Sequence, residues 1–309
     1  MSQDVNILDS AIARTRSRVL DYIELTKPEL TFLSVLTTLC GFYLASRDFN
    51  VTLFVHTAIA TALLGGGVGA LNQYIEREYD AMMRRTERRP LPAGRLLPIE
   101  VLIFGAVCSV GGIMELALFT NQLTGFLAVL TFISYLFIYT PLKRVTPLST
   151  LVGGIPGALP PMMGWTAARG SLDSEAWILF AILFCWQMPH FLSLAWMYRK
   201  DYARAGFKML AAVDPLGKRT GIQVLFFTII LVPASIAMSF IGTTGKLYLA
   251  AAILLGGSFL YFGIMLMKHT QESTAYNQTS MNLWSRRTFY ASLLYLPLLM
   301  IFMSLSRGS

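Results

Sequence analysis

Apolar segments of about 20 residues follow one another through most of this chain and limit the folds open to it. A helix needs roughly 20 apolar residues to cross the hydrocarbon core of a bilayer. Charged residues make up 14% of the chain and hydrophobic residues 55%, whereas soluble proteins carry about 25% charged residues. One aqueous core could not cover so much apolar surface, so the sequence predicts an integral membrane protein.

Nine segments have the length and composition of transmembrane helices, and Glu115, near the end of one of them, is their main charged residue. An interface or packing role explains that glutamate. We expect an all-α membrane protein that forms a single domain over residues 1–309, with residues 1–27 as a polar N-terminal arm. The predicted spans are residues 30–46, 51–71, 99–119, 122–140, 148–166, 175–197, 222–242, 247–267 and 288–306.

Short loops alternate with longer polar loops between these spans, and the cations lie almost entirely on one side. The arm and the polar loops hold 21 of the 25 Lys and Arg; the loops are residues 72–98, 141–147, 198–221 and 268–287. Cations accumulate in cytoplasmic loops, so we expect a cytoplasmic N-terminus. An odd number of spans then places the C-terminus outside. This topology explains the net charge of +8 without nucleic acid.

The arm has no apolar stretch of the kind found in secretory signals, and its charges are mixed. Its acidic residues argue against a transit peptide. We therefore expect the plasma (inner) membrane of a bacterium, with the mitochondrial inner membrane as the alternative.

The first polar stretch, LNQYIEREYDAMMRRTERRPLPAG, occupies residues 71–94 and combines oxygen-bearing side chains with arginines. Asn72, Glu76 and Asp80 are four residues apart, so a helix continuing from 51–71 would line them up on one face. Mg²⁺ prefers such hard oxygen ligands and often binds protein carboxylates and substrate phosphates together. An arginine guanidinium can donate two parallel hydrogen bonds to the oxygens of one phosphate. A solvated helix end with Glu–Arg pairs explains the spacing equally well.

The second stretch, YTPLKRVTPLSTLVGGIPGALPPMMGW, occupies residues 139–165 and places Lys143 and Arg144 directly after a helix end. Prolines inside the following apolar segment would break or kink its helix; they are Pro156, Pro160 and Pro161. Broken backbone within a membrane is tolerated where it lines a cavity. A simple kinked helix is the alternative.

The third stretch, WQMPHFLSLAWMYRKDYARAGFKML, occupies residues 186–210. His190 lies in an apolar segment, and Asp201 follows eleven residues later, about three helical turns. A polar residue inside a membrane segment is a functional candidate. Alternatively, His190 is a hydrogen-bonded packing residue and Asp201 pairs with Arg204.

Together these stretches resemble the intramembrane prenyltransferases of the UbiA superfamily, and in detail the branch that farnesylates haem. The resemblance covers about residues 22–300. In the first stretch the matching residues are Asn72, Tyr74, Arg77, Asp80, Met83, Arg85, Thr86, Arg89, Pro90, Leu91 and Gly94. The later matches are Tyr139 to Arg144, Thr146, Gly157, Ala158, Pro160, Pro161, Gly164, Trp165, Trp186, Gln187, Pro189, His190, Phe191, Asp201, Tyr202, Ala205, Gly206 and Met209.

The resemblance implies nine transmembrane helices around one central cavity, capped by cytoplasmic loops. It implies farnesyl diphosphate and haem b as substrates, haem O as product and Mg²⁺ as cofactor. Membrane lipid surrounds such an enzyme, and haem A synthase or oxidase assembly proteins are the partners it suggests.

On this basis we assign metal binding to Asn72, Glu76, Asp80 and Asp201, and further catalytic roles to Lys143 and His190. His190 would hold the haem iron, orient the macrocycle or accept a proton, and the sequence leaves these roles open. Aromatic residues such as Trp186, Trp196 and Tyr198 would pack on the porphyrin, although interfacial aromatic belts use the same residue types. The substrate-binding set is Arg77, Arg84, Arg85, Arg88, Arg89, Tyr139, Lys143, Arg144, Trp186, His190, Tyr198 and Lys200.

Two positions depart from the superfamily pattern. Position 76 is Glu where aspartate is frequent, which keeps a carboxylate but changes its reach. Asp201 stands alone where members that act on phenols carry several aspartates; this agrees with the haem branch and leaves open how a second Mg²⁺ would be held. The rival functions are prenyl transfer to an aromatic quinone precursor, membrane transport, and haem handling without catalysis.

Overall fold

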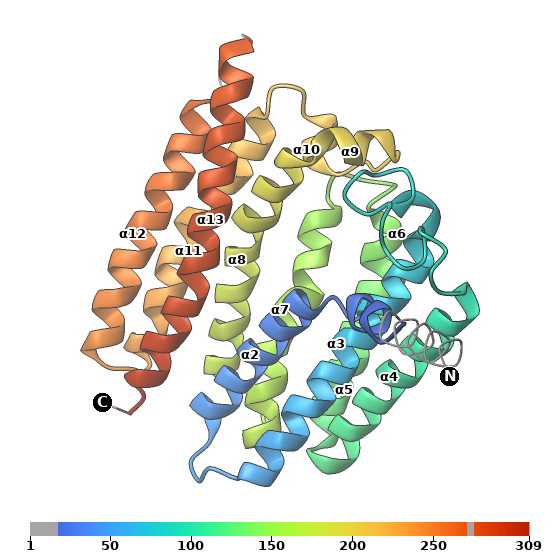
Figure 1. The fold of residues 1–309 in the computed structure, drawn as a ribbon. Helices are drawn as coiled ribbons and strands as arrows, with labels where there is room; N and C mark the ends of the chain where they lie inside the picture. The colour runs from blue at the N-terminus through green and yellow to red at the C-terminus, as the bar shows by residue number, and fades with distance from the viewer. Residues whose placement is uncertain (1–17, 271–274, 309) are drawn as a thin grey trace, which may run out of the picture.

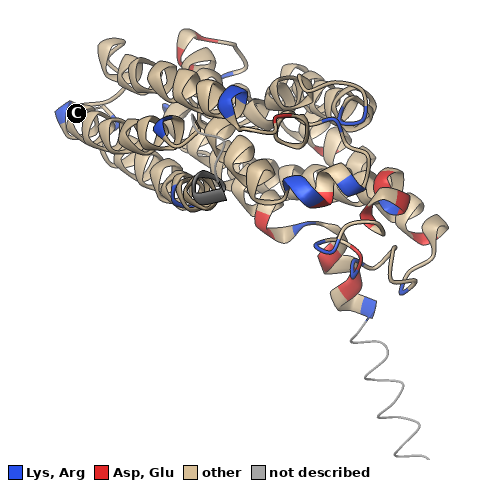
Figure 2. Cartoon of the chain, turned by 90° about the horizontal axis from the view of Figure 1, so that it is seen from above, with Lys and Arg blue, Asp and Glu red and all other residues tan. Residues whose placement is uncertain are grey.

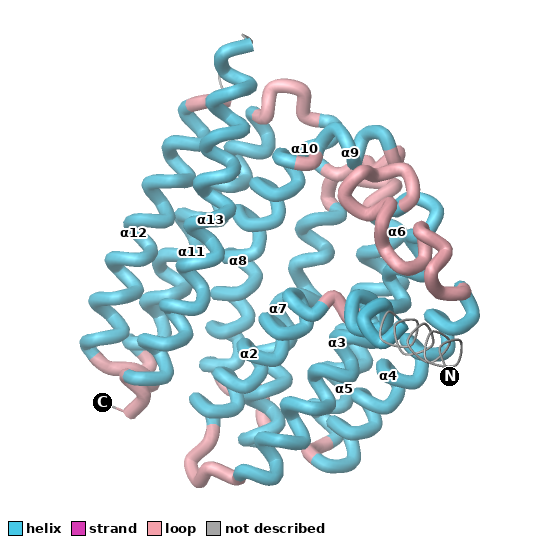
Figure 3. Tube along the Cα trace, in the orientation of Figure 1, coloured by secondary structure: helices cyan, strands magenta, loops and turns pink. Residues whose placement is uncertain are grey.

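The computed structural model describes residues 18–270 and 275–308, and this part of the chain is helical without a named strand (Figures 1 and 3). Residues 1–17 of the predicted arm lie outside the described residues. Residues 18–25 form a short helix. The elements that follow are α2 (Pro28–Ala45), α3 (Val51–Asp80), α4 (Pro98–Phe119), α5 (Gln122–Ile133), η1 (Ser134–Tyr139), α6 (Thr140–Leu142), α7 (Ser149–Arg169), α8 (Ser174–Met197), α9 (Arg199–Arg204), α10 (Leu210–Val213), α11 (Lys218–Phe240), α12 (Lys246–Lys268) and α13 (Ala275–Leu305).

Eight helices of the described chain are long and apolar enough to cross a bilayer, which makes this a multi-pass membrane protein. The segment Gln122–Leu142 counts as one span because α5, η1 and α6 run on without a gap. The predicted span 148–166 corresponds to α7, which has 21 residues but is not among these eight. The predicted number of nine spans is therefore not confirmed.

Two helices extend further on the polar side than hydropathy alone predicts. α3 continues from its apolar part to Asp80, and α13 begins at Ala275 rather than near residue 288. On α13 the Asn282 side chain accepts hydrogen bonds from Trp196 and Arg199. Hydrogen bonds of this kind stabilise polar turns as helix, and the hydropathy of the sequence cannot reveal them.

Helix α8 is the most buried of the eight candidate spans, with 67% of its apolar stretch buried, against 28–39% for the other seven. It packs against α7, α11 and α13 (Figure 1). α2 and α13, from the two ends of the chain, also lie against each other, which closes the arrangement.

Helix α7 is continuous through its three prolines, so the predicted break does not occur. Tight packing with α2 supports it: a Cβ at Gly164 would lie 1.7 Å from the Thr38 carbonyl oxygen, and a Cβ at Gly41 would lie 2.2 Å from the Pro161 carbonyl oxygen. Only glycine allows such close approach of two backbones. Neighbouring helices can re-satisfy backbone groups that prolines free.

The α2–α7 contact predicts the effect of a single methyl group. We expect Gly164→Ala to lower the free energy of unfolding by at least about 2 kcal/mol, since the group that must yield is backbone. Reversible unfolding in mixed detergent–SDS micelles measures it. Gly111→Ala is the matched control, because a Cβ there meets nothing within 4 Å; equal stability of the two variants would contradict this packing.

Candidate active site

The last turns of α3 carry the three oxygen-bearing side chains of the predicted column, and their role as metal ligands stays a prediction. Asn72, Glu76 and Asp80 lie on one face of this continuous helix and are 1%, 7% and 1% exposed. Asn72 donates from Nδ2 to Glu76 Oε2 at 3.1 Å and to Thr140 Oγ1 at 3.2 Å. The alternative of a solvated helix end is therefore wrong for this face.

Each member of the column is paired with one basic side chain from another part of the chain. Glu76 accepts from Lys143 Nζ at 2.9 and 3.1 Å. Asp80 accepts from Arg89 Nη1 at 2.7 Å. These contacts compensate two buried carboxylates, which would otherwise be very costly to desolvate.

The third pair joins Asn72 to Lys27, the last residue of the predicted N-terminal arm and not one of the predicted site residues. The Lys27 Nζ donates to Asn72 Oδ1. Burial lowers the pKa of Lys27 to about 7, helped by the positive charges of Arg89 and Lys143 and opposed by the column's carboxylates. The signal in the sequence is a lysine directly before Pro28, at the start of the first span.

Lys143 is held at the site from three sides. Burial alone would lower the pKa of Lys143, but the Glu76 carboxylate, with help from Tyr139, raises it well above its usual value. The Lys143 ammonium also lies 4.6 Å from the centre of the Tyr139 ring, and the Lys143 carbonyl accepts from the Lys208 N–H at 2.8 Å. Lys143 is thus a fixed positive charge. The π-helical turn η1 directly precedes Thr140 and Lys143 in the chain; such turns are frequent at functional sites.

The two long polar loops, residues 81–97 and 198–217, meet over this site. Tyr79 at the end of α3 contacts Phe207, with ring centres 5.7 Å apart. Arg144 donates to the Tyr79 hydroxyl at 2.7 Å, and the Arg85 guanidinium lies 5.2 Å from the Tyr198 ring. Seen from above, acidic and basic residues are concentrated in such connecting segments, and the spans are mostly uncharged (Figure 2).

Other predicted site residues have different partners. Arg77 bonds the Tyr74 carbonyl at 2.9 Å, and Asp201 pairs with Arg204 at 3.2 Å. The side chains of Arg84, Arg88 and Lys200 are exposed. Among the described residues no hydrogen bond or ion pair joins these side chains to the α3 column, so their functional roles stay predictions.

His190 and Trp186 contact α13 rather than the α3 column. His190 Nδ1 is 2.7 Å from Ser292 Oγ, and the Ser292 hydroxyl donates to the Phe289 carbonyl at 2.5 Å. When the Ser292 hydroxyl donates to the Phe289 carbonyl, the His190 ring proton lies on Nδ1 and Nε2 keeps its lone pair. Trp186 stacks on His190 with ring centres 5.0 Å apart.

The donor chemistry of the column fits a divalent cation. An amide oxygen and two carboxylates are hard ligands, and each already binds a positive group in this structure. Within the described residues no group of three or more His, Cys, Asp and Glu side chains could hold a metal. Asn72, Glu76 and Asp80 are the residues that would hold such an ion, and Asp201 as a further ligand stays a prediction.

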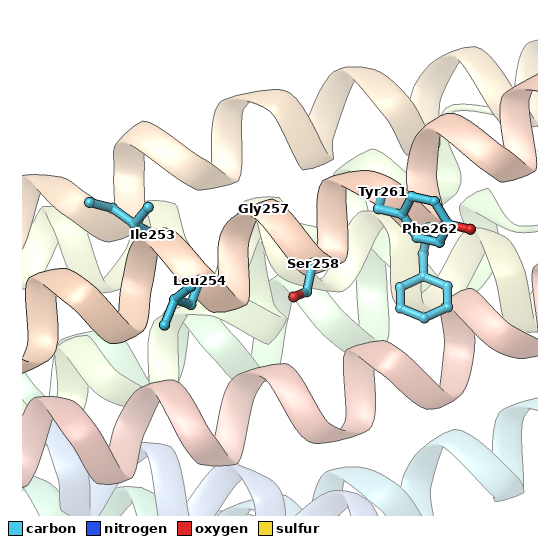
Figure 4. Close-up of a pocket in the computed structure, with 6 residues that line it drawn as sticks. All are labelled: Ile253, Leu254, Gly257, Ser258, Tyr261 and Phe262. Carbon is cyan, nitrogen blue, oxygen red and sulfur yellow. The ribbon is translucent and has the colours of Figure 1, made fainter.

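A groove on the outer side of the bundle is unrelated to this site. Its lining comes from α12 alone, with Ile253, Leu254, Gly257, Ser258, Tyr261 and Phe262 (Figure 4). α12 packs on α11 and α13, not on α3, and the groove carries no ionisable group besides a tyrosine.

The fold and the site define a multi-pass α-helical membrane protein whose buried charge pairs gather where α3 meets the polar loops. A family model described as the UbiA prenyltransferase family matches residues 34–286, and the chain belongs to this family. This confirms the resemblance seen in the motifs.

Relatives are similar over nearly the whole chain. A protein named protoheme IX farnesyltransferase from Solibacter usitatus is 44% identical over 297 residues, covering 93% of this chain and 98% of the relative. The protein of that name from Salinibacter ruber is 43% identical over 278 residues, covering 90% and 95%.

Solved structures share the fold at low identity. A digeranylgeranylglyceryl phosphate synthase superposes with a TM-score of 0.75 at 16% identity, covering 93% of this chain and 99% of that one. A UbiA homologue from Archaeoglobus fulgidus, bound to DMAPP and Mg²⁺, gives a TM-score of 0.65 at 13% identity, covering 90% and 99%.

The Lys143–Glu76 pair predicts a stability effect that needs no substrate. Lys143→Met leaves a buried carboxylate without its ammonium, so we expect the free energy of unfolding to fall by about 3 kcal/mol or more. The double variant Lys143→Met with Glu76→Gln should recover most of the loss. Unfolding in mixed micelles measures both, and a double variant as unstable as the single one would contradict the pairing.

Proposed function

We propose that this chain is a protohaem IX farnesyltransferase, also called haem O synthase. It transfers the farnesyl group of farnesyl diphosphate to a vinyl group of haem b, with addition of water, and forms haem O. The observation that carries the proposal is the 44% identity to a relative of that name over 93% of the chain. The buried column with its matched cations supports it, because a diphosphate needs such a site.

The difficult step is cleavage of the bond between the farnesyl C1 and the diphosphate oxygen. Negative charge grows on the leaving oxygen, and cations fixed in advance lower that barrier. Lys143 and Arg89 are cations fixed in this way beside the column, and Arg144, which bonds the Tyr79 hydroxyl, is a third. Mg²⁺ held by Asn72, Glu76 and Asp80 would supply further positive charge to the diphosphate.

The other product of cleavage is an allylic cation, which water would destroy. The apolar interior of the bundle, the expected central cavity, keeps water away from it and accommodates the farnesyl chain. The vinyl group of haem donates its electron pair to C1, which forms the new carbon–carbon bond. Water then adds to the resulting cation and releases a proton, which leaves a hydroxyethylfarnesyl group.

We assign the haem side to the region around His190. The ring nitrogen Nε2 has no hydrogen-bond partner within the described residues, and Nδ1–H is fixed by Ser292. A fixed tautomer of this kind suits binding to a metal or acceptance of a proton. Trp186 and Phe289 flank the ring and provide flat apolar surfaces of the kind a porphyrin packs against.

The cation distribution supports the orientation, with the N-terminus and the polar loops in the cytoplasm and the C-terminus outside. The organisms of the relatives support a bacterial inner membrane. Haem A synthase or oxidase assembly proteins would receive the product.

Substrate choice tests the proposal directly. We expect the purified protein, given labelled farnesyl diphosphate and Mg²⁺, to label haem b and not 4-hydroxybenzoate. Chromatography of the extracted products separates the two acceptors. Labelling of the hydroxybenzoate alone would indicate a quinone-pathway enzyme, and binding without any transfer would favour a transporter or a haem carrier.

Removing one carboxylate of the column tests the metal assignment. We expect Asp80→Ala to reduce turnover by at least a hundredfold. The metal that would bind the diphosphate loses one of its protein ligands, and Arg89 loses the carboxylate that holds it in place. The thermal unfolding profile in detergent should still show a folded protein. Substantial turnover by a folded variant would defeat the assignment.

His190 separates the two substrates. We expect His190→Ala to weaken use of haem b at least tenfold while binding of farnesyl diphosphate stays within twofold. Steady-state kinetics with haem varied and equilibrium binding of a farnesyl diphosphate analogue measure these effects. Equal losses for both substrates would count against a haem-side role.

A further inference from the structure

Lys27 has a backbone conformation that its residue type disfavours. Among the described residues it is the only non-glycine residue with positive φ, at 48°. The left-handed region is strained for an L-residue, whereas glycine adopts it freely. Such backbone strain indicates a side-chain function when the local structure does not otherwise need that side chain.

Capping of α2 does not explain the lysine. Lys27 is the N-cap residue of α2, yet its side chain makes no capping hydrogen bond. The ammonium instead crosses to α3 and donates to Asn72 Oδ1. The strained turn between the short helix 18–25 and Pro28 therefore delivers a cation to the column.

That contact uses the amide oxygen that we assign to the metal. Positive charges that share one ligand oxygen repel each other strongly where the surroundings exclude most water. An ammonium and a divalent ion would therefore compete for the Asn72 oxygen. A metal that enters alone must displace Lys27.

The charge balance of the cluster points the same way. Lys143 and Arg89 already balance the two carboxylates of Glu76 and Asp80, and Lys27 in its protonated form adds a further positive charge. A divalent ion alone would add to an existing positive excess. A multiply charged diphosphate that arrives with the metal gives the displaced ammonium a new partner.

We propose that Lys27 is a further substrate-binding residue that occupies Asn72 in the substrate-free site and passes to a diphosphate oxygen when metal takes that amide oxygen. Metal and diphosphate consequently bind with positive cooperativity, and the coupling is the same in either order of addition. This inference rests on the proposed function, since it takes the diphosphate substrate and the metal site from it.

The test measures binding rather than turnover. Purified full-length protein in detergent is titrated with Mn²⁺ alone, followed by the electron paramagnetic resonance signal of the free ion. A second titration uses the unreactive analogue farnesyl thiolodiphosphate alone, followed by calorimetry. For Lys27→Met we expect Mn²⁺ to bind at least fivefold more tightly and the analogue at least tenfold more weakly. Affinities that both stay within twofold of the wild type would overturn the proposal.

Two further variants keep the result interpretable. Lys27→Gly suits the left-handed backbone, so it gives the same answer where Lys27→Met does not fold. Lys246→Met removes an exposed lysine from the first residue of α12, far from the column, and should leave both affinities unchanged. A variant of Lys27 that behaves like Lys246→Met overturns the assignment.

Failure of this inference and failure of the proposed function give different results. Farnesyl transfer to haem b by the wild-type preparation tests the function alone. If the wild type transfers farnesyl while Lys27→Met and Lys27→Gly bind both probes as it does, only the role of Lys27 is overturned. A wild type that binds both probes but transfers nothing overturns the proposed function.

Discussion

Compensation of buried charge is the interaction on which the polar end of this molecule depends. Two carboxylates and an amide oxygen lie on one face of α3, nearly out of contact with solvent. Glu76 and Asp80 are stable there because Lys143 and Arg89 bond them directly. The same contacts tie α3 to the segment after α6 and to the loop after α3.

The pairs also explain why the polar loops are ordered structure and not loose connections. Lys143 is bonded through its carbonyl to the N–H of Lys208, and Arg144 reaches Tyr79, whose ring contacts Phe207. One loop therefore positions the next. The loops 81–97 and 198–217 thus form a polar cap over the column, and the spans below this cap are apolar. This separation suits a reaction in which charged groups act beside an apolar interior.

The region that we assign to haem is stabilised by apolar and aromatic contacts and not by charge pairs. His190 lies in the most buried of the eight candidate spans, and its partners within the described residues are one hydroxyl and aromatic rings. The two regions divide the proposed reaction. In that proposal the charges on α3 would hold the leaving group, while α8 and α13 would offer the haem an apolar surface with one ring nitrogen.

The sequence by itself determined the membrane class, the approximate spans, the family and the column on α3, because hydropathy and a spacing of four residues are local properties of a helix. It also placed Lys143 and Arg89 in the site through their motifs. Only the tertiary structure decided which cation meets which oxygen, that Asp201 pairs with Arg204, and that α7 stays continuous through three prolines. Lys27 is the clearest case: it lies 45 residues from Asn72 in the chain, and only the packing of α2 and its preceding turn against α3 brings the two together.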